Sequence, residues 1–200
     1  MSGEHQREQV ILEGLRRGDE ASLSELMDTY GGRVQAVCSH MTMTREEAEE
    51  ACHDAFLAAW RGASTFRGES ALSTWLYRIA INVCMHRRRS EGRLRKALSS
   101  LFEAVSGGRG LVATGGAAGA RAGPDRIAEG REEMEITRRA LQKVQPEFRA
   151  ALMLHEWQGL SHAEVASATG VPVGTVKSRI RRGRRALALA LRQRMGRRDT

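Results

Sequence analysis

The densest group of side chains suited to bind a charged partner lies near the C-terminus, between Ser161 and Leu187. Arginine and lysine recur there among short polar residues, and no carboxylate occurs between Glu164 and Asp199. Guanidinium and ammonium groups bind phosphate oxygens, and arginine and hydroxyl groups also hydrogen-bond base edges. The expected chemistry is therefore recognition of DNA. The residues that we expect to contact DNA here are Thr175, Lys177, Ser178, Arg181, Arg182 and Arg185.

Two helices joined by a tight turn are predicted to position this basic face. Ser161 and Glu164 have the spacing of a capping box, in which each side chain accepts a hydrogen bond from the other residue's backbone N–H. Gly170 can adopt the left-handed conformation that ends a helix, and Pro172 favours the start of the next one. The pattern is typical of a helix-turn-helix, whose second helix would enter the major groove.

An apolar stripe on the second helix favours this interpretation over a solvated basic helix in an ordinary bundle. Val176, Ile180 and Leu187 recur at helical spacing. They would pack on Val165 and Ala166 of the first helix. The basic run alone would fit either alternative, but the capping box, the glycine turn and the stripe together favour the helix-turn-helix.

The run GTVKSR, from Gly174 to Arg179, resembles region 4 of the bacterial sigma-70 family, specifically its extracytoplasmic-function (ECF) group. This resemblance implies that the helix recognises the −35 element of a promoter. Gly183 stands where the family usually carries alanine, and a glycine within a helix costs about 1 kcal/mol of helix propensity.

The first half of the chain predicts another small helical bundle. Asp19 can cap one helix, and Thr44 forms a capping box with Glu47 at the start of a strongly acidic helix. A break over residues 62–70 follows. A further helix is then expected from about residue 71 to residue 89.

The segment FRGESALSTWLYRIAINVCMHRRR, from Phe66 to Arg89, resembles region 2 of the same family. The resemblance implies that the acidic helix binds RNA polymerase, that a pocket captures a flipped base of the −10 element, and that the next helix reads and melts that element. The polymerase-binding residues that it implies are Glu50, Asp54, Phe56, Leu57 and Trp60. The −10 residues that it implies are Phe66, Ser70, Arg78, Asn82, Arg87 and Arg88.

Strand opening has a physical requirement that Phe66 and Asn82 could meet. A base stacked on an aromatic side chain gains about 1–3 kcal/mol, which offsets part of the cost of unstacking it. The amide of Asn82 can donate to and accept from the edge of that base. The alternative for Phe66 is a loop residue folded back on the core. For Trp60 and Trp75, core packing is the preferred interpretation.

The expected fold class is all-α, with two small helical bundles joined by a flexible linker. Glycine and other small residues dominate residues 107–123, and such a composition cannot bury enough apolar surface to fold. We expect region 2 at residues 8–90, the linker at residues 91–126 and region 4 at residues 127–194. Apolar periodicity from Leu94 to Phe102 could continue the preceding helix into the linker.

The charge distribution indicates two kinds of partner. The formal net charge is +8, yet the acidic residues gather in the first half and the arginines in the last third. We therefore expect one surface for DNA and another for a basic protein partner. With no signal peptide and no apolar run of about 18 residues, the chain is expected to be cytoplasmic, without insertion into a membrane.

Three Cys/His pairs could form a redox site or supply ligands for a soft metal ion. Their spacing matches no closed zinc motif, and small helical cores often hold free cysteine, so no metal or other cofactor is expected. We find no catalytic motif and expect no enzymatic activity. The pairs are Cys38 and His40, Cys52 and His53, and Cys84 and His86.

Two functions are consistent with these patterns. The first is a sigma subunit that binds core RNA polymerase, directs it to the −35 and −10 elements and helps to open promoter DNA. The resemblance implies an anti-sigma factor as a further partner. The second is a stand-alone transcriptional regulator with a helical sensory domain. An acidic helix followed by an aromatic loop and a basic helix favours the sigma subunit, because a sensory domain would not need them.

Overall fold

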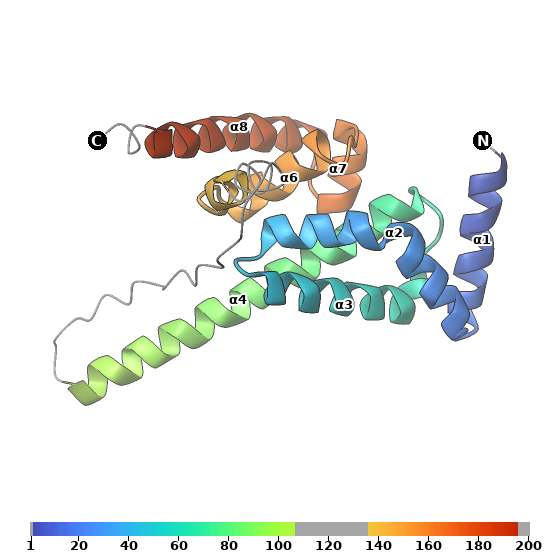
Figure 1. Ribbon diagram of the computed structural model, residues 1–200, viewed down its shortest axis with the longest axis horizontal. Coiled ribbons are helices and arrows are strands. Elements are labelled where there is room, and N and C mark those ends of the chain that lie inside the picture. The colour runs from blue at the N-terminus through green and yellow to red at the C-terminus, as the bar shows by residue number, and fades with distance from the viewer. Residues whose placement is uncertain (1, 107–135, 196–200) are drawn as a thin grey trace, which may run out of the picture.

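The computed structural model describes residues 2–106 and 136–195, and all regular structure in these ranges is helical (Figure 1). The expected all-α class is confirmed. Residues 136–142 form a short helix. The other elements are α1 (Ser2–Arg16), α2 (Glu20–Met41), α3 (Arg45–Gly62), the 3-10 turn η1 (Ala63–Thr65), α4 (Leu72–Ser106), α6 (Pro146–Glu156), α7 (His162–Thr169) and α8 (Val173–Met195).

Helices α3 and α7 begin at the capping boxes that the sequence predicts. The backbone N–H of Glu47 donates to the hydroxyl of Thr44 at 3.1 Å, and its carboxylate accepts from the Thr44 N–H at 3.3 Å. Ser161 and Glu164 make the same exchange at 3.3 and 2.8 Å. Gly170 ends α7 with φ of 68°, in the left-handed region where a Cβ would be strained.

The N-terminal bundle is built around α2, which packs on α1, α3 and α4. The inner faces of α3 and α4 carry small and apolar residues at helical spacing, as the sequence predicts. Trp60 and Trp75 are half-buried and pack on this core, consistent with the preferred interpretation. The predicted core positions that are buried are Ala48, Ala51, Ala55, Phe56, Ala59, Leu72 and Leu76.

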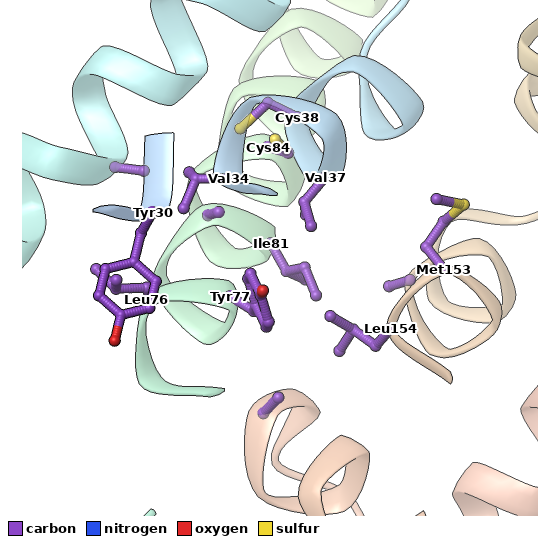
Figure 2. Packing of buried hydrophobic residues seen from close by; sticks show 14 of the residues in the cluster. Tyr30, Val34, Val37, Cys38, Leu76, Tyr77, Ile81, Cys84, Met153 and Leu154 are labelled. Atoms are coloured by element: carbon purple, nitrogen blue, oxygen red, sulfur yellow. The ribbon is translucent and has the colours of Figure 1, made fainter. Parts of the chain in front are cut away.

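Helix α4 also buries a second face that the sequence does not indicate. Tyr77 and Ile81 are almost fully buried. Figure 2 shows Leu154 of α6 lying near these two side chains, with Val37 of α2 on the other side of Ile81. This face is buried because the second bundle packs against the first.

The two bundles therefore form one continuous core, in which α7 packs on α4 and α6 packs on α2. We call this packing of α6 and α7 on α2 and α4 the closed arrangement. The sequence predicts two bundles joined by a linker and does not predict this packing, because the packing depends on side chains that are far apart in the sequence.

Helix α4 is longer than the sequence predicts. It runs for 35 residues, and its C-terminal end projects beyond the bundle (Figure 1). Residues 91–106, the first part of the predicted linker, are therefore helical, as the periodicity from Leu94 to Phe102 allows. The remainder of the predicted linker, with its glycines, lies outside the described residues.

Candidate nucleic-acid and protein interfaces

Helix α8 presents the predicted basic face to solvent. Lys177, Arg181, Arg182 and Arg185 are exposed, whereas Thr175 and Ser178 are half-buried. The Ser178 hydroxyl donates to the Thr175 carbonyl at 2.9 Å, so only its acceptor capacity is free for a base edge. The arginines therefore supply most of the hydrogen-bond donors on this face.

Helix α6 holds two of the α8 arginines in place. The guanidinium of Arg182 lies 5.8 Å from the centre of the Phe148 ring, in a cation–π contact. Arg184 pairs with Glu156, with Nε 2.8 Å from a carboxylate oxygen. The sequence places no carboxylate on α8 itself, and the fold brings Glu156 to it. Arg184 is thus partly neutralised, while Arg182 stays exposed beside the Phe148 ring.

Gly183 has a packing role that its position in the sequence does not reveal. It is buried where α8 crosses α6, and a Cβ there would lie 2.9 Å from the Phe148 carbonyl oxygen and 3.3 Å from the Leu152 Cβ. The backbone of α6 thus occupies the space that an alanine would need. Glycine lowers the helix propensity of α8 here, but it allows α6 and α8 to approach closely, and this packing offsets the cost.

We expect Gly183→Ala to lower the free energy of unfolding by about 1–2 kcal/mol, because overpacking outweighs the gain in helix propensity of about 1 kcal/mol. Gly174→Ala on the same helix is the matched control, since a Cβ there meets nothing within 4 Å. Urea unfolding of both variants measures the difference. A more stable Gly183→Ala protein would mean that α6 shifts away at little cost.

Phe66, one of the predicted −10 residues, lies in the core. Its side chain is only 7% exposed, and the ring centre is 4.9 Å from that of Trp75. Arg16 fixes the backbone of the same loop by donating to the Phe66 carbonyl at 2.8 Å. The structure thus matches the alternative of a loop residue folded back on the core. In this arrangement the ring is not open to a base.

The other predicted −10 residues lie along α4. Ser70 is half-buried just before the helix, and Arg78, Asn82 and Arg88 are exposed. Asn82 comes ten residues after Leu72, the first residue of α4, which places it about 15 Å along the axis. Asn82 is therefore well separated along the helix from the loop that holds Phe66 and Ser70.

Arg87 connects the predicted DNA-binding and polymerase-binding surfaces of the N-terminal bundle. Its Nη1 lies 2.5 Å from an Asp54 carboxylate oxygen, and its Nη2 pairs with Glu50. Both carboxylates belong to the acidic helix α3. Arg87 was predicted to contact DNA, but in the structure it ties α4 to α3.

The predicted polymerase residues of α3 divide into a core residue and a surface group. Phe56 is 2% exposed and packs inside the bundle, so in this structure it supports the helix from within. Leu57 and Trp60 are half-buried and line an open surface pocket of about 450 Å³ between α1 and α3. Together with Glu50 and Asp54 they form a face with both apolar and acidic groups.

Arg149 is the least expected polar residue of the structure, because its guanidinium is fully buried. It donates to the carbonyls of Gln142 at 2.7 Å and Val144 at 3.0 Å, which lie beside it in the second bundle. It also donates to the carbonyls of His40 and Met41 at 3.3 Å, at the end of α2. Burial lowers the pKa of Arg149 to about 10, so it stays protonated at neutral pH.

The closed arrangement has further polar contacts at the same end of α2. Gln142 donates to the Thr42 carbonyl at 3.1 Å, and Arg138 donates to the Met43 carbonyl at 2.8 Å. Cationic groups are favourable at the C-terminal end of a helix, where carbonyls lack partners. The only sequence signal for this contact was a single arginine, Arg149, beside an apolar run.

Neither a metal site nor a membrane span is found in the described part of the chain. No group of three or more His, Cys, Asp or Glu side chains there is arranged to hold a metal ion. None of the helices in residues 2–106 and 136–195 is both long and apolar enough to cross a bilayer.

Comparison with known proteins gives matches over both bundles. The family model for Sigma-70 region 2 matches residues 26–94, and that for Sigma-70, region 4 matches residues 134–187. The chain is 32% identical over 180 residues to the ECF RNA polymerase sigma-E factor of Escherichia coli K12, covering 90% of this chain and 92% of the relative. It is 33% identical over 193 residues to the RNA polymerase sigma-H factor of Pseudomonas aeruginosa, covering 93% and 94%.

Two solved structures share the fold. The sigma factor RpoE of Bartonella quintana, in complex with the anti-sigma factor NepR, superposes with a TM-score of 0.63 at 21% identity, covering 84% of this chain and 96% of that one. CnrH, in complex with the cytosolic domain of CnrY, superposes with a TM-score of 0.65 at 19% identity, covering 94% of this chain and 98% of CnrH. From the two family models and its sequence relatives, the chain belongs to the extracytoplasmic-function group of the sigma-70 family.

Proposed function

We propose that this chain is a sigma subunit that binds core RNA polymerase, directs it to the −35 and −10 elements of promoters and helps to open the DNA. The observation that carries the proposal is the exposed arginine face of α8, the second helix of the helix-turn-helix, where Arg182 contacts the Phe148 ring of α6. The chain then has no catalytic role of its own and acts in the cytoplasm, where promoter DNA lies. A stand-alone regulator would leave the region 2 match unexplained.

The described contacts refine the assignment of residues. For the −35 element we retain Thr175, Lys177, Ser178, Arg181, Arg182 and Arg185 on α8. For polymerase we retain Glu50, Asp54, Leu57 and Trp60, with Phe56 supporting them from the core. For the −10 element we retain Ser70, Arg78, Asn82 and Arg88, with Phe66 fixing the loop and Arg87 joining α4 to α3.

The closed arrangement must open before both promoter elements are bound. Positions −35 and −10 are about 25 base pairs apart, or about 85 Å of B-DNA at 3.4 Å per pair. Packed helices have axes about 8–10 Å apart, and α7 packs on both α4 and α8. Helix α8 therefore lies within about 20 Å of α4. We propose that binding to polymerase separates the two bundles.

Control by an anti-sigma factor is part of the same proposal. The RpoE structure that shares this fold is a complex with the anti-sigma factor NepR. By analogy, we propose that an anti-sigma factor restrains this chain by covering its polymerase-binding and DNA-binding surfaces.

The proposal is tested by binding to a promoter duplex with and without core RNA polymerase. One basic helix makes few phosphate and base contacts, so the chain alone should bind duplex DNA weakly at physiological salt. Fluorescence anisotropy should show a tight, sequence-specific complex only when polymerase is present. A nanomolar, sequence-specific complex of the chain alone would instead favour the stand-alone regulator.

Within this complex, Arg182→Ala should cost about 1–3 kcal/mol of binding free energy, concentrated on promoters with the matching −35 base. Arg192→Ala, an exposed arginine near the other end of α8, is the matched control and should weaken binding equally on all sequences. Both are measured on a panel of −35 variants. If Arg182→Ala instead weakens binding equally on every −35 variant and reduces the salt dependence of the affinity, Arg182 contacts a phosphate and not a base.

A further inference from the structure

Three helices bring all the cysteines of the chain into one cluster. Cys38 lies on α2, Cys52 on α3 and Cys84 on α4, and all three are free thiols. The Cys38 side chain interacts with those of Cys52 and Cys84. Figure 2 shows the Cys38 and Cys84 sulfur atoms next to each other where α2 packs on α4. We call these three residues the thiol cluster.

Cys84 is only 4% exposed, but it borders an opening at the surface. This residue lines a surface pocket of about 350 Å³ together with Arg87, Arg88 and the turn at Thr42 and Met43. Such a pocket has room for a small oxidant. Cys38 is fully buried behind it, whereas Cys52 is half-buried on the α3 side.

The surroundings of the thiols give them different roles. Interaction with the Cys38 side chain lowers the pKa of both Cys84 and Cys52 against the effect of burial, and the positive charge of Arg87 lowers the pKa of Cys84 further. Interaction with the Cys52 and Cys84 side chains, together with burial, raises the pKa of Cys38, which therefore remains a thiol. The thiolate is the reactive form of cysteine. Because Cys84 lines the pocket, we expect it to be the nucleophile, and Cys38 beside it to be the thiol that attacks next.

We propose that Cys84 and Cys38 form an oxidation site, at which hydrogen peroxide converts the two thiols into a disulfide between α4 and α2. The Cys84 sulfur attacks one peroxide oxygen, the O–O bond breaks, and a sulfenic acid forms while hydroxide leaves and becomes water. The Cys38 sulfur then attacks the Cys84 sulfur, and the S–O bond breaks to release a second water. Two thiols and one peroxide thus give one disulfide and two waters.

Oxidation changes the surface that the proposed function assigns to polymerase, and this consequence rests on that function. A disulfide has an S–S distance of about 2.05 Å, shorter than the contact between two free thiols, so it draws α4 towards α2. Arg87 lies one turn after Cys84 on the same face of α4 and pairs with Glu50 and Asp54 of α3. Displacement of Arg87 releases these carboxylates from their present positions. Oxidation should therefore weaken binding to polymerase.

The first arm of the test maps the disulfide in the full-length chain. Reduced protein is treated with a small excess of hydrogen peroxide, desalted and alkylated, and its peptides are analysed without reduction. In the wild type we expect a cross-linked Cys38–Cys84 pair and an alkylated Cys52. In Cys52→Ser we expect the same Cys38–Cys84 cross-link. Cys84→Ser should form no disulfide. Cross-links through Cys52, or oxidation no faster than that of free glutathione, would overturn the proposed site.

The second arm measures binding of labelled chain to core polymerase after the peroxide has been removed. The oxidised wild type should bind about tenfold more weakly than the reduced form, with recovery on reduction by dithiothreitol, and peroxide should not change Cys84→Ser. A mapped disulfide that leaves binding unchanged would overturn the proposed effect on polymerase. Failure of the reduced chain to bind would instead contradict the proposed sigma function, while the mapping arm still decides the oxidation site.

Discussion

Replacing Arg149 with alanine is expected to lower the free energy of unfolding by about 3 kcal/mol or more. The buried guanidinium donates to four backbone carbonyls, those of His40, Met41, Gln142 and Val144. Alanine would leave these carbonyls without their partner in the core and would create a cavity between the bundles. Urea unfolding followed by circular dichroism measures the loss.

Two control variants separate the causes of this effect. Arg184→Ala removes an exposed ion pair with Glu156 and should cost less than about 1 kcal/mol. Arg149→Lys keeps the positive charge but not the planar fork of donors, so it should lose an intermediate amount. Small-angle X-ray scattering should also show a larger radius of gyration for folded Arg149→Ala. A loss no greater than that of Arg184→Ala would mean that the buried contacts contribute little.

Phe66→Ala is expected to reduce the stability of the fold, and Asn82→Ala is expected to impair promoter opening without a loss of stability. The Phe66 ring is buried against Trp75, so alanine should lower the free energy of unfolding by about 3 kcal/mol. Asn82 is exposed, so Asn82→Ala should change stability by less than about 0.5 kcal/mol. It should nevertheless impair opening, because a captured base loses its hydrogen-bond partner.

Permanganate footprinting of unpaired thymines in the polymerase complex reports this opening directly. Asn82→Ala should bind polymerase and form closed complexes with few reactive thymines. A template already mismatched across the −10 element should restore part of the activity, since its bases are unpaired beforehand. Normal footprints would remove Asn82 from the opening step. If Phe66→Ala is as stable as the wild type, the Phe66 ring does not contribute to the core. Phe66→Leu is the control variant, because it keeps most of the buried volume.

Features that depend on neighbouring residues were predictable from the sequence. The Thr44–Glu47 and Ser161–Glu164 capping boxes and the left-handed Gly170 occur where local hydrogen bonding and backbone sterics require them. These signals fix where the helices of the helix-turn-helix begin and end. The exposed basic face of α8 follows from the same local pattern.

Features that depend on packing between distant segments were not predictable in this way. The space beside Gly183 is set by the α6 backbone, and the burial of Ile81 is set by α6 of the other bundle. Arg87 has the composition of a DNA contact, but Glu50 and Asp54 are brought to it by the crossing of α3 and α4. Each of these depends on residues that are more than about 25 positions away in the chain.

Because α7 packs on the helix that carries the proposed −10 residues, the affinity of the free chain for its targets depends on an equilibrium within the molecule. If only about one molecule in a hundred is open, any target that requires the open form is bound about a hundredfold more weakly, a difference of about 2.7 kcal/mol. Substitutions at the buried contact would tune this population without touching polymerase or DNA. The strength of the contact would then set how well the chain competes with other sigma subunits for a limited supply of polymerase.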